Sequence, residues 1–209
     1  RTGVAMPAGE EFVALPTVLE FCCAGAFVEK KAQGIVLGAF AQVHSKFPAT
    51  RLHFFGDGSL RERVELQAQT LQLQDVVEFH GTVPLDELRI FLQTRPVTLL
   101  PSIVTPSGEQ EGIPVVLIEA MANGSPVIST DTGAIAHLIT QGCGTLVEAG
   151  NVTALATAMS ELLEQSPSVT EAQCRAAHQR VMSEFSLAET SRSLLGRCLD
   201  AARALPATR

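Results

Sequence analysis

The chain has 209 residues, of which 46% are hydrophobic, and a formal net charge of −7 at pH 7. This length holds one large or two small domains with a sizeable core, and the negative charge argues against nucleic acids or anionic membranes as partners. The five cysteines are scattered without a CxxC spacing, which indicates reduced thiols of a cytoplasmic protein rather than a disulfide scaffold or a zinc site. We recognise neither a signal peptide nor an apolar run that could span a bilayer.

Short apolar runs alternate with amphipathic segments along the chain, which predicts strands alternating with helices. Residues 1–17 are small and polar, and we interpret them as a leader or interdomain crossover. The predicted strands are Val18–Ala26, Arg51–Phe55, Val76–Phe79, Pro96–Leu100, one that begins at Val127, and Thr145–Val147. The predicted helices are Ile35–Val43, Leu60–Leu71, Leu85–Gln93, Val115–Ala122, Ala134–Ile139, one capped by Asn151, and one near Thr170–Met182.

Two capping boxes are predicted at helix starts, one at Ser59 and Glu62 and one at Ser186 and Glu189. The second would open a terminal helix within residues 186–209. For residues 18–185 the alternation of elements predicts an α/β fold, a Rossmann-like three-layer sandwich with a mainly parallel sheet of about six strands and helices at its C-terminal end.

Parallel sheets of this type bind ligands outside the carboxyl ends of their strands. Polar and glycine-rich segments follow five of the predicted strands, so we expect them to converge on one crevice. These segments are Ala26–Lys31, Gly56–Ser59, His80–Thr82, Ser102–Gly112 and Asp131–Gly133.

The start of the predicted helix Val115–Ala122 suits an anion. Pro114 fits the first helical position, and the unpaired amides of Val115 and Val116 carry partial positive charge there. Lys31 could bring a cation to the same crevice, although a solvated surface lysine is the commoner case. No GxGxxG motif follows the first strand and no GxxxxGK[ST] motif occurs, which argues against dinucleotide and P-loop sites.

Two carboxylates are placed around that helix start. Glu119 is the one acid inside an apolar helix, and Glu111 precedes its first turn. A buried carboxylate needs donors or a cation, and the hydroxyls of a ribose are suitable donors. The alternatives are a capping or ion-pair role within the core for Glu119 and a solvated loop acid for Glu111, like its neighbour Glu109.

The spacing of these two glutamates in EGIPVVLIEAMANGSPVIST resembles the signature of retaining family-4 glycosyltransferases. Further segments are similar to motifs of that family in the same order. They are Ala24–Lys31 (AGAFVEKK), Phe55–Arg61 (FGDGSLR), Phe79–Pro84 (FHGTVP), Pro101-Ser102 and Gly133. The resemblance covers nearly the whole chain and implies the carboxyl-terminal, donor-binding half of an enzyme with the GT-B architecture, in which two Rossmann-like domains enclose the active site.

The resemblance implies a role for each matching residue. Glu111 would hold hydroxyls of the donor sugar and Lys31 would neutralise the diphosphate, and these two are the expected catalytic residues. Glu119 would bind the ribose, and backbone near His80 would meet the base. The expected donor-binding residues are Gly56, Gly58, His80, Gly112, Ile113, Pro114, Val115, Val116, Glu119 and Gly133. No metal and no other cofactor is expected, because in this family the donor phosphate takes the acceptor proton, and the protein mainly stabilises the departing diphosphate.

Two family positions differ in this chain: Ala26 stands where the family has a phosphate-binding arginine, and Ala32 stands where it has a glycine. The resemblance implies that the amino-terminal acceptor domain of the family has no counterpart in these 209 residues. Thr2-Gly3-Val4 resembles the crossover from that domain, and residues 186–209 resemble the helix that packs back against it.

We therefore expect the donor-binding domain of a retaining hexosyltransferase, which uses a nucleotide-diphosphate sugar and works with an acceptor domain in cis or in trans. The chain alone is expected to be inactive or incomplete, to bind no nucleic acid, and to associate with a membrane only through the other half. One alternative is a catalytically degenerate module for nucleotide-sugar or protein binding, which Ala26 motivates. Another is a sugar-nucleotide epimerase of the GT-B type.

Overall fold

The computed structural model describes residues 20–140 and 142–185. Two expectations lie outside these residues: the leader at 1–17 and the terminal helix in 186–209, with its capping box at Ser186 and Glu189. None of the described helices is both long enough and apolar enough to cross a membrane.

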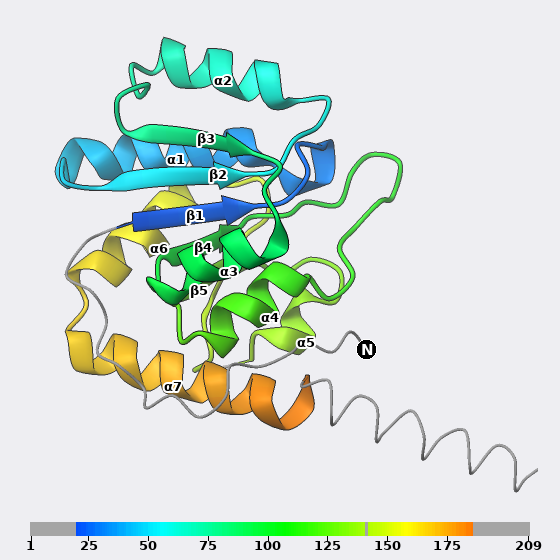
Figure 1. Ribbon diagram of the computed structural model, residues 1–209, viewed down its shortest axis with the longest axis vertical. Coiled ribbons are helices and arrows are strands. Elements are labelled where there is room, and N and C mark those ends of the chain that lie inside the picture. The colour runs from blue at the N-terminus through cyan, green and yellow to red at the C-terminus, as the bar shows by residue number, and fades with distance from the viewer. Residues whose placement is uncertain (1–19, 141, 186–209) are drawn as a thin grey trace, which may run out of the picture.

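Six parallel strands form one sheet in the order β3-β2-β1-β4-β5-β6 (Figure 1). They are β1 (Glu20–Ala24), β2 (Arg51–Phe55), β3 (Val77–Gly81), β4 (Val97–Leu100), β5 (Val127–Thr130) and β6 (Thr145–Val147). The chain builds outward from β1 to β3 and then returns to place β4 on the other side of β1, so the winding direction reverses between β1 and β4. The sheet confirms the predicted Rossmann-like fold, and the reversal marks the point at which such sheets hold ligands.

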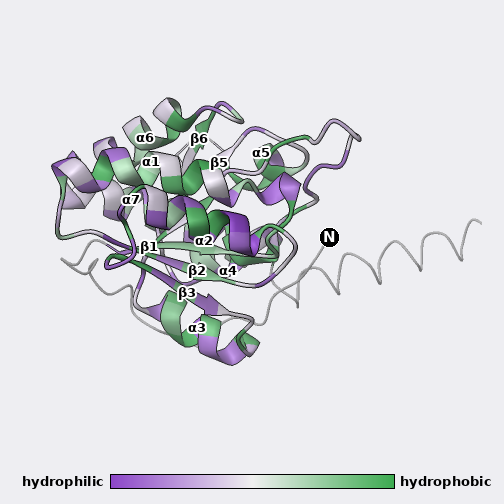
Figure 2. Cartoon of the chain, turned by 90° about the horizontal axis from the view of Figure 1, so that it is seen from above, coloured by the Kyte–Doolittle hydropathy of each residue, from purple (hydrophilic) through white to green (hydrophobic). Residues whose placement is uncertain are grey.

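Helices cover the two faces of the sheet with separate cores (Figure 1). One core includes residues of α1 (Gln33–Lys46), α2 (Arg61–Thr70) and α6 (Val152–Glu164), and a 3-10 turn, η1 (Glu29–Lys31), precedes α1. The other core includes residues of α3 (Leu85–Gln93), α4 (Val115–Ala122), α5 (Ile135–Leu138) and α7 (Pro167–Glu184). Figure 2 shows that α3 carries both hydrophobic and hydrophilic residues. Only one residue of this helix, Leu92, is fully buried.

The central helix α4 has the bounds that its apolar run predicted, and its last six residues, from Leu117 to Ala122, are all buried. Pro114 is the residue before the helix, with an extended backbone, rather than its first helical residue. After Asn123 the chain turns through Gly124 at φ +70°, the left-handed ending that this pair predicts.

The two predicted caps within the described residues had different outcomes. The Asn151 side chain accepts a hydrogen bond from the Ala154 amide at 2.9 Å, as predicted. The prediction of a capping box at Ser59 and Glu62 is wrong, because Leu60 is the residue before α2 and no side chain caps this helix. The Leu60 amide instead donates to the Phe27 carbonyl at 3.0 Å, so a contact with the β1 loop replaces the local cap.

Ala32 joins η1 to α1 in a left-handed backbone conformation, with φ 52° and ψ 38°. This is the position at which the resembled family has glycine. A Cβ atom makes this conformation cost about 1–2 kcal/mol, and glycine adopts it freely. The alanine therefore leaves strain at the turn that carries Lys31.

We predict that Ala32→Gly stabilises the chain by about 0.5–1 kcal/mol, because relief of the left-handed strain exceeds the added chain entropy of glycine. The matched control is Ala41→Gly in the interior of α1, which should destabilise by about 1 kcal/mol. Urea unfolding followed by circular dichroism measures both, and a lower midpoint for Ala32→Gly would contradict the prediction.

Candidate functional site

A cavity of about 410 Å³ opens at the carboxyl ends of β1, β2 and β3, a size typical of small-molecule sites. Its walls come from the loops after these strands and from the start of α3 and of α4. The lining residues are Ala24, Gly25, Ala26, Phe55, Gly56, Asp57, Thr82, Val83, Leu85, Leu88, Val115, Val116 and Glu119.

Backbone hydrogen bonds hold the strand-end loops together around this cavity. Gly25 donates to the Phe55 carbonyl at 2.9 Å, and Gly56 donates to the Gly81 carbonyl at 2.7 Å. A Cβ at Gly56 would lie 2.2 Å from the Gly25 carbonyl oxygen, and the residue has φ +122°. Only glycine allows so close an approach, so Gly56 acts by bringing two loops together at the cavity wall.

Glu119 is 2% exposed and forms part of the cavity wall. Arg89 of α3 donates to its Oε1 atom twice, from Nε at 3.2 Å and from Nη2 at 2.9 Å. The other oxygen, Oε2, is buried and has no hydrogen-bond partner. Hydrogen bonding to Glu119 raises the pKa of Arg89. The arrangement pairs one oxygen of Glu119 with a guanidinium and leaves the other oxygen as an acceptor available to a ligand.

Lys31 and Glu111 form an ion pair of 2.7 Å, with side chains 15% and 8% exposed. A carboxylate oxygen has two lone pairs, so Glu111 Oε1 can accept from a further donor beside Lys31. Neither residue lines the cavity, but a Cβ added to the lining residue Gly25 would lie 3.7 Å from Lys31 Nζ. The pair therefore lies directly behind the cavity wall.

Gly133 fixes the position of Glu111. A Cβ at Gly133 would lie 2.1 Å from the Glu111 carbonyl oxygen, and its φ is +55°. The Ala134 amide donates to the same carbonyl at 3.2 Å. The loop after β5 thus supports the glutamate loop through backbone contacts rather than through a side chain.

The predicted site residues fall into two groups. Gly56, Val115, Val116 and Glu119 line the cavity. The predicted residues outside the lining are Lys31, Gly58, His80, Glu111, Gly112, Ile113, Pro114 and Gly133.

Two of the outer residues have clear structural positions. Gly58 packs against the Phe27 backbone, where a Cβ would lie 2.6 Å from its oxygen. The His80 ring stacks on Phe55 at 4.3 Å between centroids, so it touches the cavity only through that phenyl ring. Burial lowers the pKa of the neighbouring His53.

Sequence reasoning missed Arg89 and most of the wall formed by residues 82–88. The requirement that a buried acid has a partner did indicate an ion pair for Glu119, but it did not indicate which cation. Arg89 lies 30 positions earlier on another helix, and no local pattern marks such a contact.

Three of the four described cysteines, Cys22, Cys23 and Cys174, do not offer a nucleophile. Burial raises the pKa of Cys22 well above its usual value, that of Cys23 to about 12 and that of Cys174 to about 11. These thiols stay protonated near neutral pH, and only the thiolate is strongly nucleophilic.

A family model described as "Glycosyl transferases group 1" matches residues 14–180. WcaL of Salmonella typhimurium, described as a colanic acid biosynthesis glycosyltransferase, is 33% identical over 177 residues. The match covers 84% of this chain and 44% of the relative, so the chain spans less than half the length of that protein.

Two solved structures share the fold. The C-terminal domain of the group 1 glycosyl transferase LpcC from Francisella tularensis has a TM-score of 0.72 at 18% identity, covering 83% of this chain and 89% of that one. Anabaena HepE in complex with UDP has a TM-score of 0.73 at 22% identity, covering 88% of this chain and 49% of that one.

We predict that Lys31→Met lowers the free energy of unfolding by about 1–3 kcal/mol, because it leaves the Glu111 carboxylate buried without its cation. The double variant Lys31→Met/Glu111→Gln should lose less than the sum of the two single variants. Lys30→Met, which removes the adjacent lysine, serves as the control. Urea unfolding of the four variants measures the coupling, and additive losses would show that the two side chains do not stabilise each other.

Proposed function

The chain belongs to the group 1 glycosyltransferases as a carboxyl-terminal domain of the GT-B type, and from this premise we propose that its cavity binds a nucleotide-diphosphate sugar. The hexosyl group is then transferred, with retention of configuration, to an acceptor held by an amino-terminal domain in cis or in trans. The observation that carries the proposal is the free, buried Oε2 atom of Glu119 in the cavity wall.

Glu119 is the proposed ribose-binding residue. Two ribose hydroxyls are neutral donors on neighbouring carbons, and a fixed carboxylate oxygen accepts from such a pair. The Arg89 bonds to Oε1 determine the rotamer of Glu119 and compensate its charge. The ligand therefore meets a pre-positioned acceptor, which reduces the entropy lost on binding.

The diphosphate is proposed to lie at the start of α4. Val115 and Val116 line the cavity, and no side chain caps this helix. Their amides point out of the first turn, where the helix dipole favours an anion. Lys31 lies behind Gly25. It is proposed to supply a cation to the phosphate by exchanging part of its contact with Glu111.

Glu111 is proposed to hold hydroxyls of the donor sugar, since its Oε1 keeps acceptor capacity beside Lys31. The donor phosphate is proposed to take the proton of the acceptor hydroxyl as the sugar–phosphate bond breaks. In that scheme the chain binds and orients the donor, and it stabilises the charge that builds on the departing diphosphate.

A second candidate, a nucleotide-sugar-binding module without transfer activity, is favoured by one observation. Ala26 is exposed and lines the cavity at the position where the resembled family has arginine, so a guanidinium is lacking at the proposed leaving group. Turnover by the unmodified chain with an acceptor domain supplied would exclude this candidate.

We predict that calorimetry with UDP, GDP and ADP finds one diphosphate that binds, and that Glu119→Gln weakens its binding about 10- to 100-fold, the value of a charged hydrogen bond. The control is Glu109→Gln, which changes an exposed acid in the loop before α4 and should leave binding unchanged. With a 2′,3′-dideoxy analogue the Glu119→Gln effect should vanish, because the hydroxyls are gone. No binding of any diphosphate by the folded chain would contradict the proposal.

We predict that Ala26→Arg raises affinity for the bound nucleoside diphosphate about tenfold or more, because it adds a charged hydrogen-bond donor at the phosphates. The matching nucleoside should bind both forms equally. Ala26→Gln, which adds length without charge, is the control. An equal gain for nucleoside and diphosphate would show that the phosphates lie elsewhere.

A further inference from the structure

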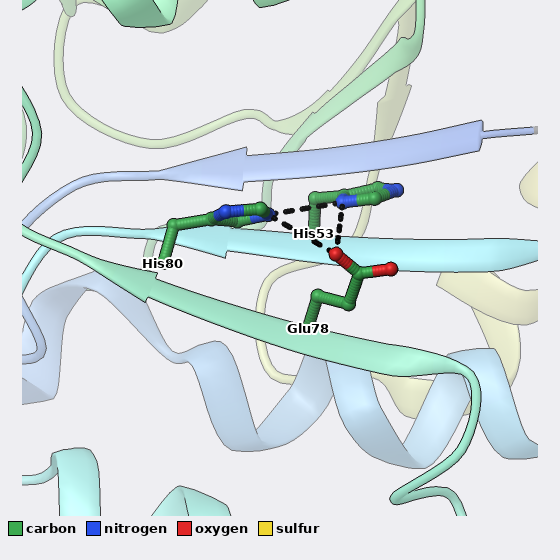
Figure 3. A group of neighbouring side chains, drawn as sticks. All are labelled: His53, Glu78 and His80. Atoms are coloured by element: carbon green, nitrogen blue, oxygen red, sulfur yellow. Dashed lines mark hydrogen bonds and ion pairs between the residues drawn. The ribbon is translucent and has the colours of Figure 1, made fainter.

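Three side chains with metal-binding atoms meet on the outer part of the sheet, and none of the three lines the cavity. They are His53 of β2 and Glu78 and His80 of β3, shown in Figure 3. His53 lies opposite Glu78 in the strand register. Glu78 and His80 are two positions apart on one strand, which places both on the same face.

A bulge brings His80 into this group. Phe54 lies opposite Phe79, but Phe55 lies opposite Gly81, so the register shifts by one residue and His80 has no partner on β2. Bulges of this type re-aim a side chain. The His80 ring turns over β2, where it stacks on Phe55 and comes within 3.1 Å of His53.

The donor atoms are spaced as zinc ligands are. His53 Nδ1 lies 3.1 Å from His80 Nε2, and Glu78 Oε2 lies 3.8 Å from each of these nitrogens. A triangle with these sides has a circumradius of about 2.1 Å, and Zn–N and Zn–O bonds are about 2.0–2.2 Å long. A zinc ion can therefore contact all three atoms with only small side-chain adjustments.

The surroundings also fit a metal ligand. His53 is 6% exposed, and its other ring nitrogen, Nε2, is buried without a hydrogen-bond partner. The nearest acid is Glu20, whose Oε1 lies 4.0 Å from that nitrogen. A metal-bound histidine usually donates its second N–H to a carboxylate, and Glu20 is placed for this role once Nδ1 binds the ion.

The remaining contacts fix the rings and leave one side open. The Phe91 ring of α3 packs against the His53 ring, with 4.8 Å between the ring centroids. Arg51 contacts Oε1 of Glu78 at 3.4 Å, so Oε2 is the oxygen left for an ion, while the Arg51 charge weakens cation binding somewhat. The Glu78 side chain is 48% exposed, which gives solvent access to a fourth coordination position.

We infer that His53, Glu78 and His80 form a zinc-binding site that ties β3 to β2, with water as the fourth ligand. Two imidazoles and one carboxylate form a donor set that suits Zn²⁺, whereas Ca²⁺ and Mg²⁺ prefer oxygen alone. The site has no part in the proposed sugar transfer and does not depend on that proposal.

The test is a titration of the whole chain, freed of metal by a chelator, with ZnCl₂ in competition with a chromophoric chelator. We expect one equivalent to bind and to raise the melting temperature, and EDTA to reverse the shift. His80→Gln and Glu78→Gln, two partly exposed side chains, should each weaken binding at least tenfold. His137→Gln, an exposed histidine of α5, should bind as the unmodified chain does.

Circular dichroism establishes that each variant is folded, and the visible spectrum of Co²⁺ in place of Zn²⁺ reports the coordination directly. A four-coordinate Co²⁺ spectrum in the unmodified chain that is lost in His80→Gln supports the site. Failure of the folded chain to bind one equivalent of zinc overturns the site. Zinc binding by His80→Gln and Glu78→Gln that is as tight as that of the unmodified chain also overturns it, and assigns the bound zinc to other groups such as thiols.

Discussion

The buried charge of Glu119 is the constraint on which the candidate site depends. A carboxylate within an otherwise apolar helix is costly to bury without partners, and Arg89 supplies them for one of its oxygens. That contact joins α3 to α4, and both helices contribute residues to the cavity lining. The same interaction therefore stabilises the wall and orients the acceptor. The second oxygen remains unsatisfied in the structure, which is costly for folding alone and is understandable where a ligand supplies donors.

Local sequence patterns were sufficient for the fold. The bounds of β2, α3, α4 and β6 agree with the apolar runs that predicted them, because strand and helix periodicities are local properties. The predictions that failed concern positions where contacts between distant chain segments determine the local structure. The start of α2 is held by a backbone bond from the Leu60 amide to Phe27 of the β1 loop, where a side-chain cap at Ser59 was expected.

The site was predictable in its location but only partly in its members. Alternating strands and helices place polar loops at one edge of the sheet, so Gly56 and Glu119 could be identified from sequence. Arg89 could not, because its contact depends on how α3 packs on α4. The meeting of His53 with His80 depends on how β2 pairs with β3, and the pattern of neither strand specifies that register.

Val83, Leu85 and Leu88 form one wall of the cavity, and this wall comes from a different chain segment than the carboxylate and the glycine turns. It lies on a short segment that carries part of α3, whose one fully buried residue is Leu92, whereas the carboxylate and the glycine turns belong to the framework of the sheet. Evolution can therefore exchange the exposed Leu85 at little cost to folding, whereas Val83 and Leu88 also pack against the second core. Related proteins could diverge in which ligand they prefer while they retain the same anchoring groups.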